Sequence, residues 1–118
     1  MRNKYLVIFS ITIIAIIVVY LAYFKKQADG QFDVFAQCLA DKGVIMYGAD
    51  WCSHCQSEKQ AFGDSFRLVP YIECPEEPQK CLEAGITGYP TWIFFDGEKL
   101  EGEQGIEKLS KESGCLLR

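Results

Sequence analysis

"GADWCSHCQSEK", residues 48–59, places two cysteines three positions apart, directly after a short apolar run. That run, "VIMY" at residues 44–47, predicts a buried strand, and residues 56–65 predict a helix with the cysteine pair at its start. Unpaired amide N–H groups and the helix dipole stabilise an anion at a helix start, and the thiolate is the form of cysteine that attacks disulfides. The position of Cys52 and Cys55 therefore favours a redox-active pair.

Two other interpretations of this pair stay open. A structural zinc site needs four ligands, but the chain has a single histidine, His54, and it lies between the two cysteines. Cys74 and Cys81 are separated by six residues, which is a poor second ligand pair. We therefore expect no metal site. An inert bridge is the third interpretation, since most cysteines in exported domains are structural.

Helix and strand patterns alternate along the rest of the chain. Apolar residues at positions 32, 35, 36, 39 and 40 predict an amphipathic helix that Gly43 ends. Asp96-Gly97 is a strong two-residue hairpin signal between two short strands. The remaining expected elements are strands at 69–74, 91–95 and 98–102, and helices at 78–84 and 106–113.

These segments resemble a known superfamily. "WCSHC" after "VIMYG", with "GYPT" reaching its proline 35 residues past Cys55, resembles the thioredoxin-like oxidoreductases over residues 31–115. "MYGADWCSHCQSEKQAFG", "VPYIEC" and "AGITGYPTW" look most like the thioredoxin-like domain that accompanies bacterial vitamin K epoxide reductase homologues. The resemblance implies an α/β, thioredoxin-like fold with a four-stranded mixed sheet flanked by helices, here preceded by one N-terminal transmembrane helix.

The resemblance also implies roles for individual residues. Cys52 matches the exposed nucleophilic cysteine, and Cys55 matches the more buried cysteine that resolves mixed disulfides. Pro90 matches a cis-proline that packs opposite the disulfide and offers backbone to a substrate chain. Tyr89 and Thr91 then flank the substrate-docking edge.

Three further residues bear on the direction of the reaction. Trp51 matches the family tryptophan and is expected at the rim of the active site. His54 can stabilise the neighbouring thiolate, which makes the disulfide a stronger oxidant, and Cys-x-His-Cys resembles the oxidising DsbA-type sequence. An exposed polar filler is the alternative role for His54. Met46 stands where reducing thioredoxins carry a buried Asp that assists proton transfer to the resolving cysteine.

The four other cysteines are expected to form structural disulfides. Cys74 and Cys81 match a second pair in the reductase-associated domains, with a relay to the active site as the alternative role. Cys38 and Cys115 are then left to pair with each other. Six cysteines permit fifteen pairings, so this assignment is a hypothesis.

The N-terminal segment differs from the rest of the chain. Residues 5–24 carry no charge and are long enough to cross a bilayer as a helix. We expect a retained signal-anchor at residues 1–26, a linker at 27–30 and the folded domain at 31–118; a cleavable signal peptide is the alternative. Flanking positive charges are nearly balanced. The dense cysteines favour an oxidising compartment, which places the N-terminus in the cytoplasm and the domain in the periplasm or at the cell surface.

The charge of the soluble part excludes one class of partner. Residues 27–118 carry eight Lys and Arg residues against sixteen Asp and Glu residues, a net charge of −8, which argues against nucleic-acid binding. Four phenylalanines are expected in the core: Phe62, Phe66, Phe94 and Phe95. Five glutamates are expected on a solvated face: Glu76, Glu77, Glu98, Glu101 and Glu103.

Together these features predict a membrane-anchored, extracytoplasmic thiol–disulfide oxidoreductase that needs no cofactor. It would oxidise exported protein thiols and pass electrons to a membrane partner resembling vitamin K epoxide reductase. Two alternatives stay open: an anchored disulfide reductase of the cytochrome-maturation or repair type, and a non-catalytic thioredoxin-like module that binds proteins or carries a metal through its thiols.

Overall fold

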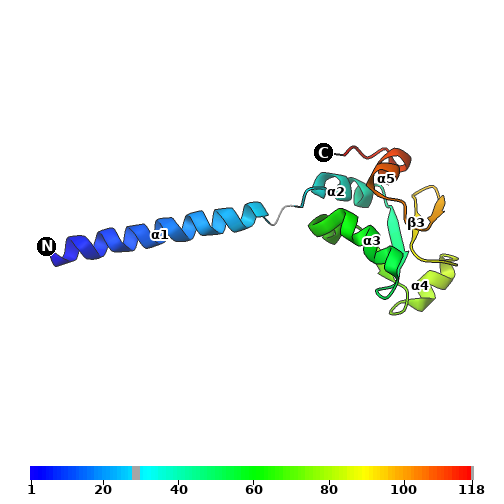
Figure 1. Ribbon diagram of the computed structural model, residues 1–118, viewed down its shortest axis with the longest axis horizontal. Helices are drawn as coiled ribbons and strands as arrows, with labels where there is room; N and C mark the ends of the chain where they lie inside the picture. The colour runs from blue at the N-terminus through cyan, green and yellow to red at the C-terminus, as the bar shows by residue number, and fades with distance from the viewer. Residues whose placement is uncertain (28–29, 118) are drawn as a thin grey trace.

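The computed structural model describes residues 1–27 and 30–117 (Figure 1). The predicted linker includes residues 28–29, which lie outside this described part. The elements follow in this order: α1 (Arg2–Gln27), α2 (Asp33–Asp41), β1 (Ile45–Gly48), α3 (Ser53–Phe62), the 3₁₀ helix η1 (Gly63–Leu68), β2 (Tyr71–Glu73), α4 (Pro78–Glu83), β3 (Thr91–Ile93), β4 (Lys99–Glu101) and α5 (Ile106–Ser113).

α1 is one continuous helix. Its segment Arg2–Phe24 is long and apolar enough to cross a membrane, and its apolar side chains are exposed. A helix of this length and composition at an N-terminus fits a membrane anchor and a signal sequence equally well.

The four strands form one mixed sheet in the order β2-β1-β3-β4. β1 runs parallel to β2, and the pairs β1–β3 and β3–β4 are antiparallel. This arrangement confirms the expected four-stranded mixed sheet flanked by helices. The register places Met46 of β1 between Tyr71 of β2 and Trp92 of β3, so these three side chains share one face of the sheet.

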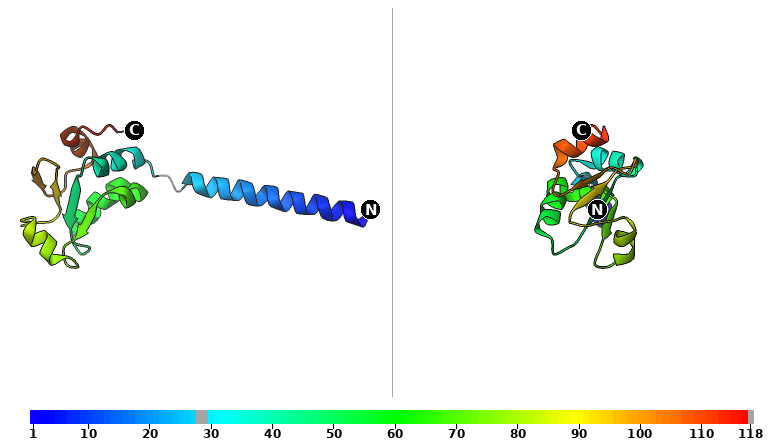
Figure 2. Two further views of the ribbon diagram at one scale, coloured as in Figure 1. Left: turned by 180° about the vertical axis from the view of Figure 1, so that it is seen from behind. Right: turned by 90° about the vertical axis from the view of Figure 1, so that its right-hand side faces the viewer.

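The two faces of the sheet have separate cores. The face of Met46 and Trp92 packs against α2, α3 and α5, through residues such as Leu39, Phe62 and Leu109. The other face, centred on Tyr47, packs against α4. Accordingly, α4 lies on the far side of the domain from α2 and α5 in every view (Figures 1 and 2).

Two details differ from the sequence-based expectation. α3 begins at Ser53, three residues earlier than predicted, and ends at Phe62, because Gly63 takes a positive φ of 56° that stops the helix. Phe95 was expected in the core, but this prediction is wrong: Phe95 is 78% exposed because it follows the end of β3 in the hairpin loop. Phe62 and Phe94 are buried as expected, and Phe66 is partly buried.

Candidate active site

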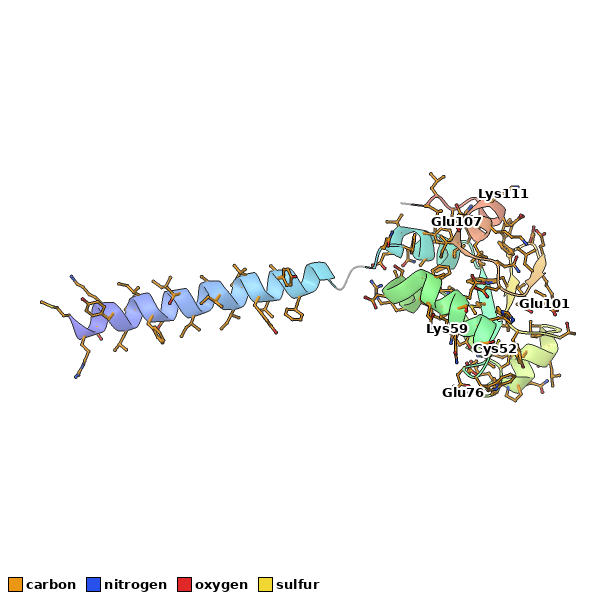
Figure 3. The ribbon with its side chains drawn as sticks, in the orientation of Figure 1. Cys52, Lys59, Glu76, Glu101, Glu107 and Lys111 are labelled. Atoms are coloured by element: carbon orange, nitrogen blue, oxygen red, sulfur yellow. A yellow bond between two sulfur atoms is a disulfide. The ribbon has the colours of Figure 1, made fainter. Side chains whose placement is uncertain are left out.

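Cys52 and Cys55 lie where β1 passes into α3 (Figure 3). Cys52 is the N-cap residue of α3, with extended backbone angles, and its sulfur accepts a hydrogen bond from the backbone N–H of Cys55 at 3.3 Å. The first N–H groups of a helix have no partner within the helix, so the sulfur takes the place of a capping oxygen.

The two sulfurs differ in burial. Both cysteines are unpaired thiols in this structure; Cys52 is 9% exposed and Cys55 is completely buried. Cys52 is thus less exposed than the resemblance implied. Its sulfur lies 3.7 Å from the carbonyl oxygen of Tyr89, so the loop before β3 covers part of it.

Burial also separates the two thiols chemically. Burial, together with the hydrogen bond to Cys52, raises the pKa of Cys55 to about 12. Cys55 therefore carries its proton at neutral pH. Any reaction in which Cys55 attacks or leaves as a thiolate must move this proton.

Of the three expected docking residues Tyr89, Pro90 and Thr91, Tyr89 contacts the Cys52 sulfur through its carbonyl oxygen. The Tyr89–Pro90 peptide bond is cis, and the Thr91 hydroxyl, which is buried, donates to the carbonyl of Gly88 at 2.8 Å. Trp51 is 69% exposed, and its ring meets the ring of Tyr89 edge to face at 5.9 Å between centroids. The two rings form an apolar rim beside the sulfur, which is suited to contact with a peptide chain.

His54 lies two positions after Cys52 in the chain. Its Nδ1 lies 3.2 Å from a carboxylate oxygen of Glu103, in the segment between β4 and α5. Both side chains are exposed, by 70% for His54 and 42% for Glu103. We had expected Glu103 on a solvated face without a role in the site. The sequence gives no signal for this pair, because its members are 49 positions apart.

A second pair, Tyr71 and Glu73, was not predicted at all. The Tyr71 hydroxyl donates to one carboxylate oxygen of Glu73, and the other oxygen accepts from the backbone N–H of Asp50 at 2.8 Å. A side-chain carbon built at Gly48 would lie 2.9 Å from the Cys55 sulfur and 3.2 Å from the Tyr71 hydroxyl. The pair therefore lies directly behind Cys55. The sequence holds one signal for this pair: Tyr71 and Glu73 are two positions apart in a predicted strand, so their side chains share a face.

The other four cysteines are joined in two disulfides. Cys38 of α2 is bonded to Cys115 after α5, and Cys74 after β2 is bonded to Cys81 of α4. These are the pairs of the sequence-based hypothesis. Within residues 1–27 and 30–117, no three His, Cys, Asp or Glu side chains gather in a group that could hold a metal ion.

Comparison with known proteins gives one matching family model, described as thioredoxin, over residues 24–113. Thiol-disulfide oxidoreductase LTO1 of Arabidopsis thaliana is 36% identical over 110 residues, which are 82% of this chain and 29% of that protein. Protein disulfide isomerase-like 2-2 of Oryza sativa subsp. japonica is 29% identical over 85 residues, 60% of this chain and 23% of that protein. The chain thus spans less than a third of the length of these relatives.

Among solved structures, the reduced C-terminal domain of DsbD from Neisseria meningitidis is 22% identical, over 69% of this chain and 86% of that one, with a TM-score of 0.35. A similarity at this level adds nothing to the family assignment.

Proposed function

This chain belongs to the thioredoxin family, and from that membership we propose that it is a thiol–disulfide oxidoreductase whose reacting atoms are the sulfurs of Cys52 and Cys55. The observation that carries the proposal is the pair of unpaired thiols at the start of α3, of which Cys52 keeps an exposed fraction of 9% whereas Cys55 is completely buried. A sulfur at the surface can form a disulfide with another protein, whereas a buried sulfur can react only with its neighbour. Two-step exchange requires this asymmetry.

In the oxidising direction the cycle starts from a Cys52–Cys55 disulfide. A substrate thiolate attacks the Cys52 sulfur, the bond to Cys55 breaks, and Cys55 leaves and takes up a proton. A second substrate thiolate then attacks the substrate sulfur of the mixed disulfide, so that Cys52 leaves as a thiolate and the substrate keeps a disulfide. Two electrons have passed from the substrate to the cysteine pair, and no cofactor is needed.

The substrate docks along the rim beside Cys52. Trp51 and Tyr89 supply apolar contact, and the backbone carbonyl of Tyr89 borders the sulfur. An extended peptide can pair with exposed backbone of this kind, which would hold its cysteine against Cys52.

Two features support the oxidising direction. His54 occupies the variable position before Cys55, where Cys-x-His-Cys resembles the oxidising DsbA-type sequence, and Met46 has no proton to give or take where reducing thioredoxins carry an acid. Reoxidation of the pair would pass its electrons to a membrane protein resembling vitamin K epoxide reductase. The resemblance of the active-site segments to the domains that accompany such reductases supports this partner, as does the short stretch between α1 and α2, which would keep the domain near the membrane.

We place the domain, residues 31–118, on the extracytoplasmic side, with residues 1–26 as its anchor and 27–30 as its linker. The apolar length of α1 and the two disulfides support this location, since disulfides persist in oxidising compartments. Alkaline carbonate extraction of membranes tests the anchor. An anchored chain stays in the membrane pellet, whereas a chain freed by cleavage after a signal sequence is released with a lower mass.

The decisive test is to trap the mixed disulfide. Cys55→Ala removes the resolving thiol, so Cys52 should remain bound to its substrate or partner, and mass spectrometry of the trapped species identifies it. The matched control is Cys52→Ala, Cys55→Ala, which should trap nothing. The absence of any Cys52-linked species in the single variant would refute the exchange function. Measurement of the Cys52–Cys55 potential then tests the direction: a value near about −270 mV, as in thioredoxin, contradicts the oxidising role.

A further inference from the structure

Every step of the proposed cycle that makes or breaks the Cys52–Cys55 bond moves a proton at Cys55. Cys55 is completely buried, so bulk water does not reach its sulfur. Met46, on the neighbouring strand, offers no acid or base. The proton must therefore pass through another group in contact with the space around Cys55.

Glu58, a fully buried carboxylate on α3, does not fit this task. One of its oxygens accepts from the backbone N–H of Gln104 at 2.6 Å and from the indole N–H of Trp92 at 3.4 Å. The other accepts from the N–H of Gly105 at 2.9 Å. Its contacts join α3 to the start of α5 and lead away from Cys55, which makes Glu58 a structural residue.

Tyr71 lies beside Met46 and, unlike Met46, has a hydroxyl group that can carry a proton. It is the direct neighbour of Met46 across the β1–β2 pair and lies on the same face of the sheet. Its hydroxyl and the Cys55 sulfur both lie within 3.2 Å of the position that a Cβ of Gly48 would occupy. Because Gly48 has no side chain, the hydroxyl and the sulfur both approach its Cα and lie at most about 6 Å apart, a separation that direct contact or one bridging water molecule covers.

The hydroxyl of Tyr71 is also connected to the surface. It donates to Glu73, which is only partly buried and whose second oxygen is fixed by the backbone N–H of Asp50. Burial, and next to it the hydrogen bond to Glu73, raises the pKa of Tyr71 well above its ordinary value, so its own proton stays in place at neutral pH. A hydroxyl that keeps its proton can still relay one, by accepting a proton on one side while donating on the other.

Other charged and titratable groups also act on Tyr71 and Cys55, and they come from α3 and from the segment just before it. Lys59 of α3 has its ammonium group 3.8 Å from the centre of the Tyr71 ring. Asp50, in the segment before α3, and Cys52, at the start of the helix, complete the set. Lys59 favours negative charge on Cys55, and Asp50 favours protonated Tyr71.

We propose that Tyr71 and Glu73 form a proton relay for the resolving thiol. The inference rests on the exchange function proposed above. When Cys55 attacks the Cys52 sulfur of a mixed disulfide, the Cys55–Cys52 bond forms and the bond from Cys52 to the partner sulfur breaks. The partner leaves as a thiolate, the Cys55 proton passes to the Tyr71 oxygen, and the Tyr71 proton passes to the Glu73 carboxylate, which returns it to solvent. The reverse steps protonate Cys55 when it leaves.

The test separates the two chemical steps. The reduced full chain in detergent is mixed with glutathione disulfide at several concentrations between about pH 6 and 9, a range that brackets the working range of a relay. The attack by Cys52 depends on the glutathione disulfide concentration, whereas the closure by Cys55 does not. Quenching with acid followed by mass spectrometry counts the reduced, glutathionylated and closed forms at each time.

Tyr71→Phe keeps the ring and removes the hydroxyl, and Glu73→Gln keeps one of the two acceptor oxygens and removes the base. Both should slow closure about 100-fold at neutral pH, the lower end of what a general acid or base contributes, and closure should then accelerate with rising pH. The attack by Cys52 should keep its rate. Tyr47→Phe, on the opposite face of the sheet, is the matched control and should change neither step.

Closure at the wild-type rate and with the wild-type pH profile in either variant would overturn the relay. So would equal slowing of both steps, because a loss of packing around the site would cause that. If the wild-type chain itself forms no glutathione adduct at Cys52, the exchange function fails, and this outcome is seen before any variant is compared.

Discussion

The backbone N–H of Cys55 donates to the sulfur of Cys52 across 3.3 Å, while the sulfur of Cys55 is itself completely buried. One turn of helix thus gives two cysteines opposite properties. The sulfur of Cys52 accepts from a helix N–H group, and the residue keeps an exposed fraction of 9%, whereas Cys55 is enclosed in the core. This difference follows from the position of the pair at the junction of β1 and α3.

The first prediction concerns alkylation. At neutral pH, iodoacetamide should modify Cys52 in the reduced chain and leave Cys55 unmodified, because the pKa of Cys55 is raised to about 12 and its sulfur is not exposed. Peptide mapping by mass spectrometry measures both sites. In guanidinium chloride the two cysteines should react alike. Equal modification of both in the folded chain would contradict the burial on which this prediction rests.

The second prediction concerns His54. Its replacement, His54→Ala, should lower the Cys52–Cys55 potential by about 30 mV, equivalent to about 1.4 kcal/mol, because it removes a neighbouring side chain that can stabilise the reduced form when protonated. Glu103→Gln should act in the opposite direction, because it removes the negative charge that lies beside the ring of His54. Equilibration with glutathione buffers measures all three potentials. If the potential is the same in both variants and the wild-type chain, His54 is an exposed polar residue without a role in the redox chemistry.

Much of the fold could be predicted from local patterns. α5 lies at the predicted residues, and the Asp96-Gly97 turn joins β3 to β4 as expected. These features depend on residues close together in the chain: a turn-forming pair, an apolar period, a glycine with positive φ. The start of α3 was placed too late because the cap is a cysteine rather than one of the usual capping residues.

The polar side of the active site could not be predicted in the same way. Two of its contacts join residues far apart in the chain: His54 with Glu103, 49 positions apart, and Asp50 with Glu73, 23 positions apart. Only the folded domain brings these segments together. An isolated glutamate in a sequence looks the same whether it faces solvent or binds a backbone N–H. From its residue type alone, Glu58 would also be assigned to the surface, because glutamate is seldom fully buried.

The third prediction concerns this buried carboxylate. Glu58→Gln should lower the free energy of unfolding by about 2 kcal/mol, because an amide has one acceptor oxygen and leaves one of the N–H groups of Gln104 and Gly105 without its partner. Urea unfolding in detergent, followed by tryptophan fluorescence, measures the change. Glu112→Gln, at an exposed position of α5, is the control and should change it little. Equal stability of both variants would remove the structural role of Glu58.

The fourth prediction concerns acid. The hydrogen bond from Arg67 lowers the pKa of Asp33 from 3.8 to about 2. Since the folded pKa is below the unfolded one, ionised Asp33 stabilises the fold above the unfolded pKa, and this contribution is lost as the pH falls through about 2. Between pH 3.8 and about 2, Asp33→Asn should therefore lose less stability than the wild-type chain. Urea unfolding midpoints measured at a series of pH values test this. Asp41→Asn, which can keep its contact with Gln37, should retain the wild-type pH dependence.

The last prediction separates the two structural disulfides by the length of chain that each closes. Cys38–Cys115 spans 77 positions and Cys74–Cys81 spans seven. A cross-link restricts the unfolded chain more when its loop is longer, by about 4.5 kcal/mol for the first loop and about 2.5 kcal/mol for the second. Replacing both cysteines of a pair by Ser should therefore lower the free energy of unfolding more for Cys38 and Cys115.

Urea unfolding of the two double variants tests this order, with the Cys52–Cys55 pair reduced in every sample. The comparison is informative because the second pair lies in the small core around Tyr47, where the loss of buried contacts is the competing effect. If the Cys74 and Cys81 variant is the less stable, packing of α4 against the sheet outweighs chain entropy. In that case the Cys74–Cys81 bond, despite its short loop, holds α4 on its face of the sheet.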